Sequence, residues 1–273
     1  MRNPLLSASL FAALLLPAAC SESSDDTGPS NPAGASSGGT SSGGTSSGGT
    51  SSGGTAGTGG TSGAGGANTG GASGRFYATN FDGSENPISE GGAWTNGGEV
   101  GLDWQNIVKD QGIGFGSGTS AGYDDCLAHL SGFAPNHYAE ATVHAASGYS
   151  APSSHEVELL LRFRITAHSA RGYEVLNGWN GAYSQIVRWN GPLDDFTYLS
   201  TTGPGYGVLV EGDVIRATVV GSTITVYKNG AEVMQASDST WSDGDPGIGM
   251  FIRPGAGAEP LAFCYTSFAA GDL

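Results

Sequence analysis

The sequence "DVIRATVVGSTITVYKNGAEVM", residues 213–234, alternates apolar and polar side chains with the two-residue period of a β-strand. A tight turn at Gly221 and Ser222 would fold it into a hairpin whose apolar side chains share one face. The predicted pairs are Val220 with Thr223, Val219 with Ile224, Ala217 with Val226 and Ile215 with Lys228. Asn229-Gly230 is typical of a type I′ turn and predicts that the chain returns as a third strand at 231–234. A slip of one residue would turn the apolar face to water, so the pattern itself specifies the register.

The same period recurs upstream, in "EVELLLRFRIT" at 156–166 and in "YAEATVHAAS" at 138–147. In the first of these, strict alternation predicts an apolar core face made of Val157, Leu159, Leu161, Phe163 and Ile165. The opposite, polar face would carry Glu156, Glu158, Arg162, Arg164 and Thr166. We find no long amphipathic helix between Arg75 and the C-terminus. Short alternating strands separated by turn residues predict an all-β fold, an antiparallel two-sheet jelly-roll sandwich.

The N-terminal part has the features of an export signal and a tether. Residues 1–19 contain a short apolar run that is too brief for a bilayer span, and they predict a signal peptide. The following "LPAAC" resembles the lipobox of bacterial lipoproteins, which implies lipidation of Cys20; an ordinary secreted protein cleaved nearby is the alternative. Residues 20–74, with their "SSGGT" repeats, predict a disordered Gly/Ser/Thr-rich linker, because such a segment has almost no apolar surface to bury. We therefore expect an exported monomer, lipid-anchored at the outer membrane or cell surface, with one folded domain at 75–273.

Charge and cysteines narrow the expected partners. The chain has a formal net charge of −15 and only ten Lys and Arg residues, so a nucleic-acid partner is excluded and anionic polysaccharides are disfavoured. The membrane would be reached only through the lipid anchor. In an oxidising compartment, Cys126 and Cys264 predict one disulfide, with two buried thiols as the alternative.

Several motifs together carry a family resemblance. They are "FDGSENPISEGGAW" at 81–94, the strand pair "ELLLRFR" and "GYEV", the hairpins at 212–233, "GDPGIGMF" at 244–251 and "FAAGDL" at 268–273. In this order they resemble the concanavalin A-like lectin and glucanase superfamily, in its laminin G-like jelly-roll branch. The resemblance implies the fold and leaves the function open among lectins, hydrolases, lyases and adhesive domains. It also implies a structural calcium ion, for which Asp82 and Asp272 are candidate ligands, and no other cofactor.

The motifs of glycan-cleaving relatives are incomplete. Hydrolases of the superfamily resemble one another in an E-x-D-x-x-E strand, whereas "HEVELLL" offers Glu156 and Glu158 and no third carboxylate. Cross-strand charge pairs on a solvated sheet explain these two residues better. Alginate-lyase relatives carry a His where "SQIVRW" has Val187, and no G-x-S-x-G nucleophile elbow or metal-binding His pair occurs. We regard scattered His residues of this kind as surface residues.

The segment "GYEVLNGWNGAYSQIVRWNG", residues 172–191, gathers the residue types that bind sugars. Aromatic rings stack on pyranose faces, and amide, carboxylate and guanidinium groups hydrogen-bond hydroxyls. The candidate ligand-binding residues are Trp179, Tyr183, Trp189, Glu174, Asn177, Asn180, Gln185 and Arg188. Core packing is the alternative for Trp189, whereas Trp179 is expected at a loop tip where packing gives no reason for it.

We therefore predict a non-catalytic, lectin-like module that binds a glycan or another cell-surface partner. One alternative is a glycan-active hydrolase or lyase that uses Glu174, or the pair Glu156 and Glu158, as catalytic residues. A structural or adhesive surface protein that binds no sugar is the other.

Overall fold

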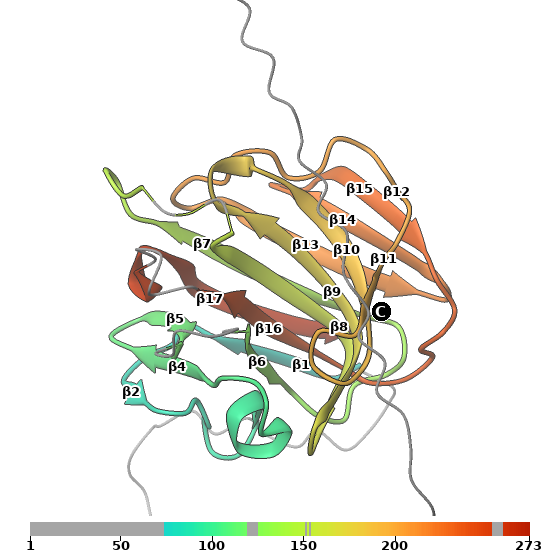
Figure 1. Cartoon of the computed structure of the whole chain (residues 1–273), viewed down its shortest axis with the longest axis horizontal. Coiled ribbons are helices and arrows are strands. Elements are labelled where there is room, and N and C mark those ends of the chain that lie inside the picture. The colour runs from blue at the N-terminus through green and yellow to red at the C-terminus, as the bar shows by residue number, and fades with distance from the viewer. Residues whose placement is uncertain (1–73, 119–124, 151, 153, 253–258) are drawn as a thin grey trace, which may run out of the picture. The chain divides into compact units, whose positions relative to one another are not determined.

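The computed structural model describes residues 74–118, 125–150, 152, 154–252 and 259–273 (Figure 1). The expected signal peptide, the lipidation site at Cys20 and the linker up to residue 73 lie outside these residues. The described residues form two antiparallel sheets with almost no helix, which confirms the predicted jelly-roll-like sandwich. The helical segments are one π-helical turn, η1 (Gly97–Gly101), and two 3₁₀ turns, η2 (Trp179–Gly181) and η4 (Pro260–Ala262). No described helix is long and apolar enough to span a bilayer.

One sheet has ten strands and includes the two hairpins predicted from residues 213–234. Its order is β12 (Thr201–Thr202), β15 (Ala231–Ser237), β14 (Thr223–Lys228), β13 (Val214–Val220), β7 (His137–Ala145), β17 (Phe263–Asp272), β5 (Ile113–Gly116), β4 (Ile107–Asp110) and β2 (Ser84–Glu85), with β1 (Phe76–Thr79) also paired to β17. Strands β13 and β14 pair in the predicted register from Ile215–Lys228 to Val220–Thr223. Asn229 and Gly230 both have positive φ, at 50° and 81°, as a type I′ turn requires.

The second sheet has seven strands and carries the candidate site. Its order is β11 (Phe196–Tyr198), β10 (Ser184–Gly191), β9 (Ser169–Gly178), β8 (Glu156–Thr166), β16 (Asp245–Phe251), β6 (Asp125–His129) and β3 (Thr95–Asn96). Between the sheets lies the main apolar core, to which β8 contributes Val157, Leu159 and Leu161 as predicted. On the outer face of the seven-stranded sheet lies a second apolar layer, made of Trp104, Leu127, Leu160, Phe163, Ile165, Ala170, Leu176, Val187 and Trp189.

A β-bulge places Phe163 and Ile165 in this outer layer, so their predicted position in the main core is wrong. The register of β8 against β9 shifts between Leu161 and Arg164, and Arg162 has a positive φ of 48°. One extra residue reverses the facing of all later residues of the strand. Gly172 makes room for the bulge, since a Cβ there would lie 2.6 Å from the Phe163 ring.

Two buried histidines hold the bulge in place. The backbone N–H of Arg162 donates to Nε2 of His137 at 3.1 Å, and that of Ile165 donates to Nε2 of His129 at 3.3 Å. Burial lowers the pKa of both imidazoles, which fits the neutral acceptor form. The expectation that the histidines lie on the surface is therefore wrong for these two and for His155, which is also buried.

The predicted disulfide is not formed. Cys126 and Cys264 are buried thiols on β6 and β17, strands that belong to different sheets. The Cys126 sulfur lies over Gly116, where an added Cβ would come within 2.6 Å of it, and the Cys264 thiol contacts the Leu261 carbonyl at 3.6 Å. The two sulfurs thus have different neighbours, and both thiols belong to the main core. Cys126 and Cys264 are therefore two buried thiols, which was the alternative to the predicted disulfide.

Candidate functional site

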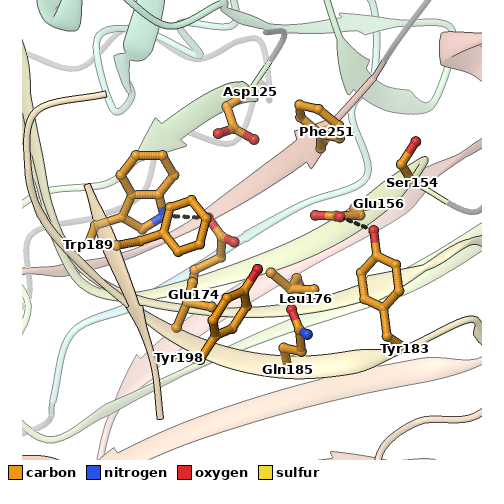
Figure 2. A pocket seen from close by; sticks show the side chains of 12 residues that line it. Asp125, Ser154, Glu156, Glu174, Leu176, Tyr183, Gln185, Trp189, Tyr198 and Phe251 are labelled. Carbon is orange, nitrogen blue, oxygen red and sulfur yellow. Dashed lines mark hydrogen bonds between the residues drawn. The ribbon is translucent and has the colours of Figure 1, made fainter. Parts of the chain in front are cut away.

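A pocket of about 340 Å³ opens on the outer face of the seven-stranded sheet (Figure 2). Strands β6, β8, β9, β10, β11 and β16 contribute to it, because every second residue of a strand points to the same face. Its lining combines four carboxyl or amide side chains, several aromatic rings and a few small or aliphatic residues. The lining residues are Asp125, Ser154, Glu156, Glu174, Leu176, Tyr183, Gln185, Val187, Trp189, Phe196, Tyr198 and Phe251.

Three glutamates come together at this pocket: Glu156 and Glu174 line it, and the buried Glu158 lies beside them. Glu156 and Glu158 are alternate residues of β8, and Glu174 comes from the neighbouring strand β9, where it pairs with Leu160. One carboxylate oxygen from each lies within 4.8 Å of the others. The third carboxylate that the β8 sequence lacks is therefore supplied by β9. Asp125 of β6 is the third carboxylate of the lining, beside Glu156 and Glu174 (Figure 2).

Glu158 and Glu174 are removed from solvent. Their exposed fractions are 0% and 3%, and no described salt bridge includes either of them. Gly249 of β16 lies opposite Glu158, and a Cβ at Gly249 would lie 2.1 Å from Glu158 Oε2. The glycine therefore leaves the space that the buried carboxylate occupies.

Aromatic side chains hold two of the three carboxylates. The Trp189 indole Nε1–H donates to Glu174 Oε2 at 2.8 Å, and the Tyr183 hydroxyl donates to Glu156 Oε1 (Figure 2). Neither oxygen of Glu158 receives a hydrogen bond from an N–H or hydroxyl group of the described residues, and its carboxyl lies within hydrogen-bonding reach of Glu174. The cluster thus contains two carboxylates oriented by aromatic donors and a third that has only another carboxyl beside it.

Burial and like charge both act on the protonation of these groups. Burial raises the pKa of Glu158 well above its usual range, and the nearby charges of Glu174 and Asp125 raise it further. Burial also raises the pKa of Glu174, and Asp125 and Glu156 add to the effect. Such a cluster needs protons or an external cation to offset its charge, and strongly perturbed acids in a cavity are typical of functional sites.

The cross-strand charge pair of β8 in the described residues joins Arg164 to Asp245 of β16 at 3.8 Å and includes neither glutamate. Arg162 donates through Nε to the Pro135 carbonyl at 2.8 Å, and Arg164 donates to Asp243 at 3.1 Å. Both arginines lie at or after the bulge, away from the glutamates. The interpretation as charge pairs on a solvated face is therefore wrong for Glu158, because Glu158 is buried and the charged groups near it are other carboxylates.

Four of the eight predicted ligand-binding residues line the pocket: Glu174, Tyr183, Gln185 and Trp189. Gln185, Val187 and Trp189 share one face of β10, as alternation predicts. Trp189 packs in the outer apolar layer, as the alternative expectation for it states, since it is 2% exposed; it also lines the pocket, and its binding of a ligand stays a prediction.

The other four predicted residues lie outside the pocket. Asn177 is buried and donates to the Gly178 carbonyl at 3.1 Å, while Asn180 is exposed in η2 with a positive φ of 58°. Arg188 points to the opposite face of β10 and forms an ion pair with Asp238 at 2.6 Å. Trp179 packs edge-on against Tyr149 and Phe263 at 5.1 and 5.0 Å, so the inference that packing gives no reason for it is wrong.

Sequence reasoning missed the residues that the fold brings in from other strands. Asp125, Phe196, Tyr198 and Phe251 belong to β6, β11 and β16, outside the aromatic segment. Leu160 was one available signal that the outer face of β8 is not open to solvent. It is an apolar residue on the face that alternation predicts to be polar, and it belongs to the outer apolar layer. No local pattern marks Asp125, because its role depends on strand order alone.

Asp82 and Asp272, the candidate calcium ligands, lie beyond opposite ends of β1. Both Asp272 oxygens accept backbone N–H groups, from Ala134 and Arg75, each at 2.7 Å. Asp82 is exposed. Within the part of the chain that the structure describes, Glu156, Glu158 and Glu174 are the group of acidic, His or Cys side chains with metal-ligand spacing. A calcium ion at Asp82 and Asp272 stays a prediction.

Comparison with known proteins bears on the fold. No protein-family model and no curated protein matches the chain. Among solved structures, it is similar to a carbohydrate-binding module, CBM66, from Bacillus subtilis, with 14% identity over 68% of this chain and 95% of that one and a TM-score of 0.45. A Bacillus subtilis protein of unknown function with a galectin-like fold shows 11% identity over 71% and 94%, with a TM-score of 0.44. A prokaryotic β-1,3-1,4-glucanase from a mouse hindgut metagenome shows 14% identity over 72% and 95%, with a TM-score of 0.40.

At such identities and TM-scores the similarity assigns neither a family nor a function to this chain. Unrelated functions share this architecture, so the function has to be argued from the pocket.

Proposed function

We propose that the outer pocket of the seven-stranded sheet binds carbohydrate. The observation that carries the proposal is the meeting of aromatic rings and hydrogen-bonding side chains around one cavity of about 340 Å³. Tyr198 and Tyr183 offer ring faces to the apolar side of a pyranose. Gln185 and the carboxylates of Glu156 and Glu174 can bind hydroxyl groups.

The charge of the pocket selects the class of sugar. Four carboxylates contribute to its lining and floor, and the whole chain carries a net charge of −15. An anionic sugar would be repelled at this site, whereas an uncharged glycan presents only hydroxyl groups to the carboxylates. We therefore expect neutral glycans as ligands.

A glycan-array screen of the full chain, with titration of the best ligand, tests this proposal. Tyr198 is 60% exposed on β11 at the pocket, so Tyr198→Ala removes a stacking face without opening the core. We expect about tenfold weaker binding, or ~1.4 kcal/mol. Tyr227→Ala, a partly exposed tyrosine on β14 of the other sheet, is the matched control and should bind like the wild type. A folded chain that binds no glycan, or a Tyr198→Ala variant with unchanged affinity, refutes the proposal.

Cleavage of a glycosidic bond is the second candidate function, and the glutamate cluster favours it. Retaining hydrolases place two carboxyl groups about 5–5.5 Å apart, and one oxygen each of Glu156, Glu158 and Glu174 lies within 4.8 Å of the others. Release of reducing ends from a bound glycan, abolished in Glu174→Gln with binding retained, would establish an enzyme. Binding without any turnover would leave a lectin-like module.

We further propose that lipid on Cys20 and the linker up to residue 74 present this domain at the outer membrane or cell surface, as the sequence predicts. Metabolic labelling of the full chain with a fatty acid tests the anchor. The label should be lost in Cys20→Ser, and label retained in that variant would contradict lipidation at this residue.

A further inference from the structure

The pocket floor has the dimensions of a cation site. Calcium binds oxygen ligands at 2.3–2.6 Å, so two ligands on opposite sides of the ion lie up to about 5 Å apart. The Glu156, Glu158 and Glu174 oxygens lie within 4.8 Å of one another and therefore fit one coordination sphere. All three are hard oxygen ligands, which suit calcium or magnesium and not the softer metals that prefer thiolate or imidazole.

Glu158 supplies a separate reason to expect a ligand here. Its side chain is 0% exposed, and neither oxygen receives a hydrogen bond from an N–H or hydroxyl group of the described residues; the carboxyl within reach is that of Glu174. Buried carboxylates are normally paired with a cation or with N–H donors, because an uncompensated buried charge is unfavourable. The surrounding acids Glu156, Glu174 and Asp125 supply no positive charge, so either a proton shared within the cluster or an external cation has to offset the charge of Glu158.

The site around these oxygens is also prearranged. Trp189 and Tyr183 donate to Glu174 and Glu156 and thereby fix the orientation of two carboxylates. Gly249 leaves the space that the Glu158 carboxylate occupies, where a Cβ would approach to 2.1 Å. Hydrogen bonds that orient the ligating groups are a regular feature of metal sites.

We propose that Glu156, Glu158 and Glu174 bind one divalent cation of the size of calcium at the floor of the pocket. Calcium takes six to eight oxygen ligands, so several positions remain open toward the cavity. If the pocket binds glycan, sugar hydroxyls can fill these positions in place of water. This last step rests on the proposed function, whereas the cation site does not.

Calorimetric titration of the EDTA-treated full chain with calcium chloride tests the site without any sugar. We expect one ion per chain and at least tenfold weaker binding in Glu158→Gln, a substitution that preserves shape. Glu232→Gln, an exposed glutamate on β15 of the other sheet, should leave affinity unchanged. Thermal unfolding of each variant confirms that it is folded. Absence of binding in the wild type, or equal affinity in a folded Glu158→Gln, overturns the proposal.

Terbium luminescence locates the ion in the wild-type chain, even if a glutamate variant fails to fold. Trp189 donates to Glu174 and so lies beside the proposed ion, and its excitation should sensitise Tb³⁺ emission that calcium then competes away. The emission should fall by more than half in Trp189→Phe. Terbium that binds without sensitised emission would place the ion elsewhere and overturn the assignment.

Glycan binding with and without EDTA separates the two proposals. Glycan bound only with calcium supports both, and calcium bound without any glycan retains the cation site while refuting sugar binding. Glycan bound equally well in EDTA by a chain that takes up no calcium retains sugar binding and refutes the cation site.

Discussion

Replacing His137 should show how a buried imidazole maintains the bulge of β8. His137 is 0% exposed, and its Nε2 accepts the Arg162 N–H at 3.1 Å while Nδ1 contacts the Ala134 carbonyl at 2.7 Å. The imidazole is therefore neutral, with its proton on Nδ1. His137→Leu leaves the buried Arg162 N–H without an acceptor, which costs about 1–3 kcal/mol of unfolding free energy. His137→Gln can keep an amide oxygen near the Nε2 position and should lose less.

The pH dependence of the same variants gives an independent check. Burial lowers the pKa of His137 and the positive charge of Arg162 lowers it further, partly opposed by the Ala134 contact, Asp245 and Asp272. An unfolded histidine titrates near pH 6.5, so below that pH the unfolded chain takes up a proton that the folded chain refuses. On acidification, His137 should therefore lower the unfolding free energy of the wild type relative to that of His137→Gln.

Urea unfolding of the full chain at pH 7.5, 6.5 and 5.5, followed by tryptophan fluorescence, measures both effects. His144→Gln is the control for placing Gln on β7, since His144 is partly exposed on the same strand. Equal loss of stability in His137→Leu and His137→Gln at pH 7.5 would refute the acceptor role. Parallel loss of stability in the wild type and His137→Gln on acidification would refute the titration argument.

Three further predictions test other parts of the structure. Burial lowers the pKa of His155 to about 4, so the unfolding free energy of the wild type should drop by about 3 kcal/mol relative to His155→Phe between pH 6.5 and 4; parallel urea-unfolding curves would contradict this. Gly249→Ala introduces a Cβ only 2.1 Å from Glu158 Oε2, and we expect a lower urea midpoint, equivalent to about 1–3 kcal/mol, together with weaker calcium binding. Iodoacetamide in denaturant without reductant should modify both Cys126 and Cys264 in peptide mass spectra, because both are thiols; a protected pair would restore the disulfide.

The sequence was most informative where local rules decide the structure. The register of β13 and β14 follows from alternation and from two turn signals, and the structure has the predicted pairs. Alternation also placed Gln185 and Trp189 on one face of β10, and both line the pocket. Turn chemistry and side-chain facing depend on residues a few positions apart, so a single chain suffices to predict them.

Prediction was weakest where distant strands or small irregularities decide the structure. The bulge at Arg162 reverses the facing of Phe163 and Ile165, and its cause is long-range, since His137 and His129 supply the acceptors. Glu174 completes the glutamate cluster only because β9 pairs with β8. Strand order and buried hydrogen bonds of this kind have no signature in the order of residues along β8.

The outer apolar layer explains why the carboxylates are chemically unusual and not merely solvated. Leu160, Leu176 and Val187 lie beside the glutamates on the same face of the sheet and keep water from part of the pocket floor. In such surroundings each charge interacts more strongly with any ion or hydroxyl that enters than it would at an open surface. Because these groups stand on paired strands and not on loops, their spacing is fixed before a ligand arrives, and little ordering is needed on binding. If the outer apolar layer strengthens cation binding by the glutamates, Leu160→Ala should weaken calcium binding although it removes no ligand atom. Calorimetry on a folded Leu160→Ala chain measures this effect, and an unchanged affinity would refute the argument.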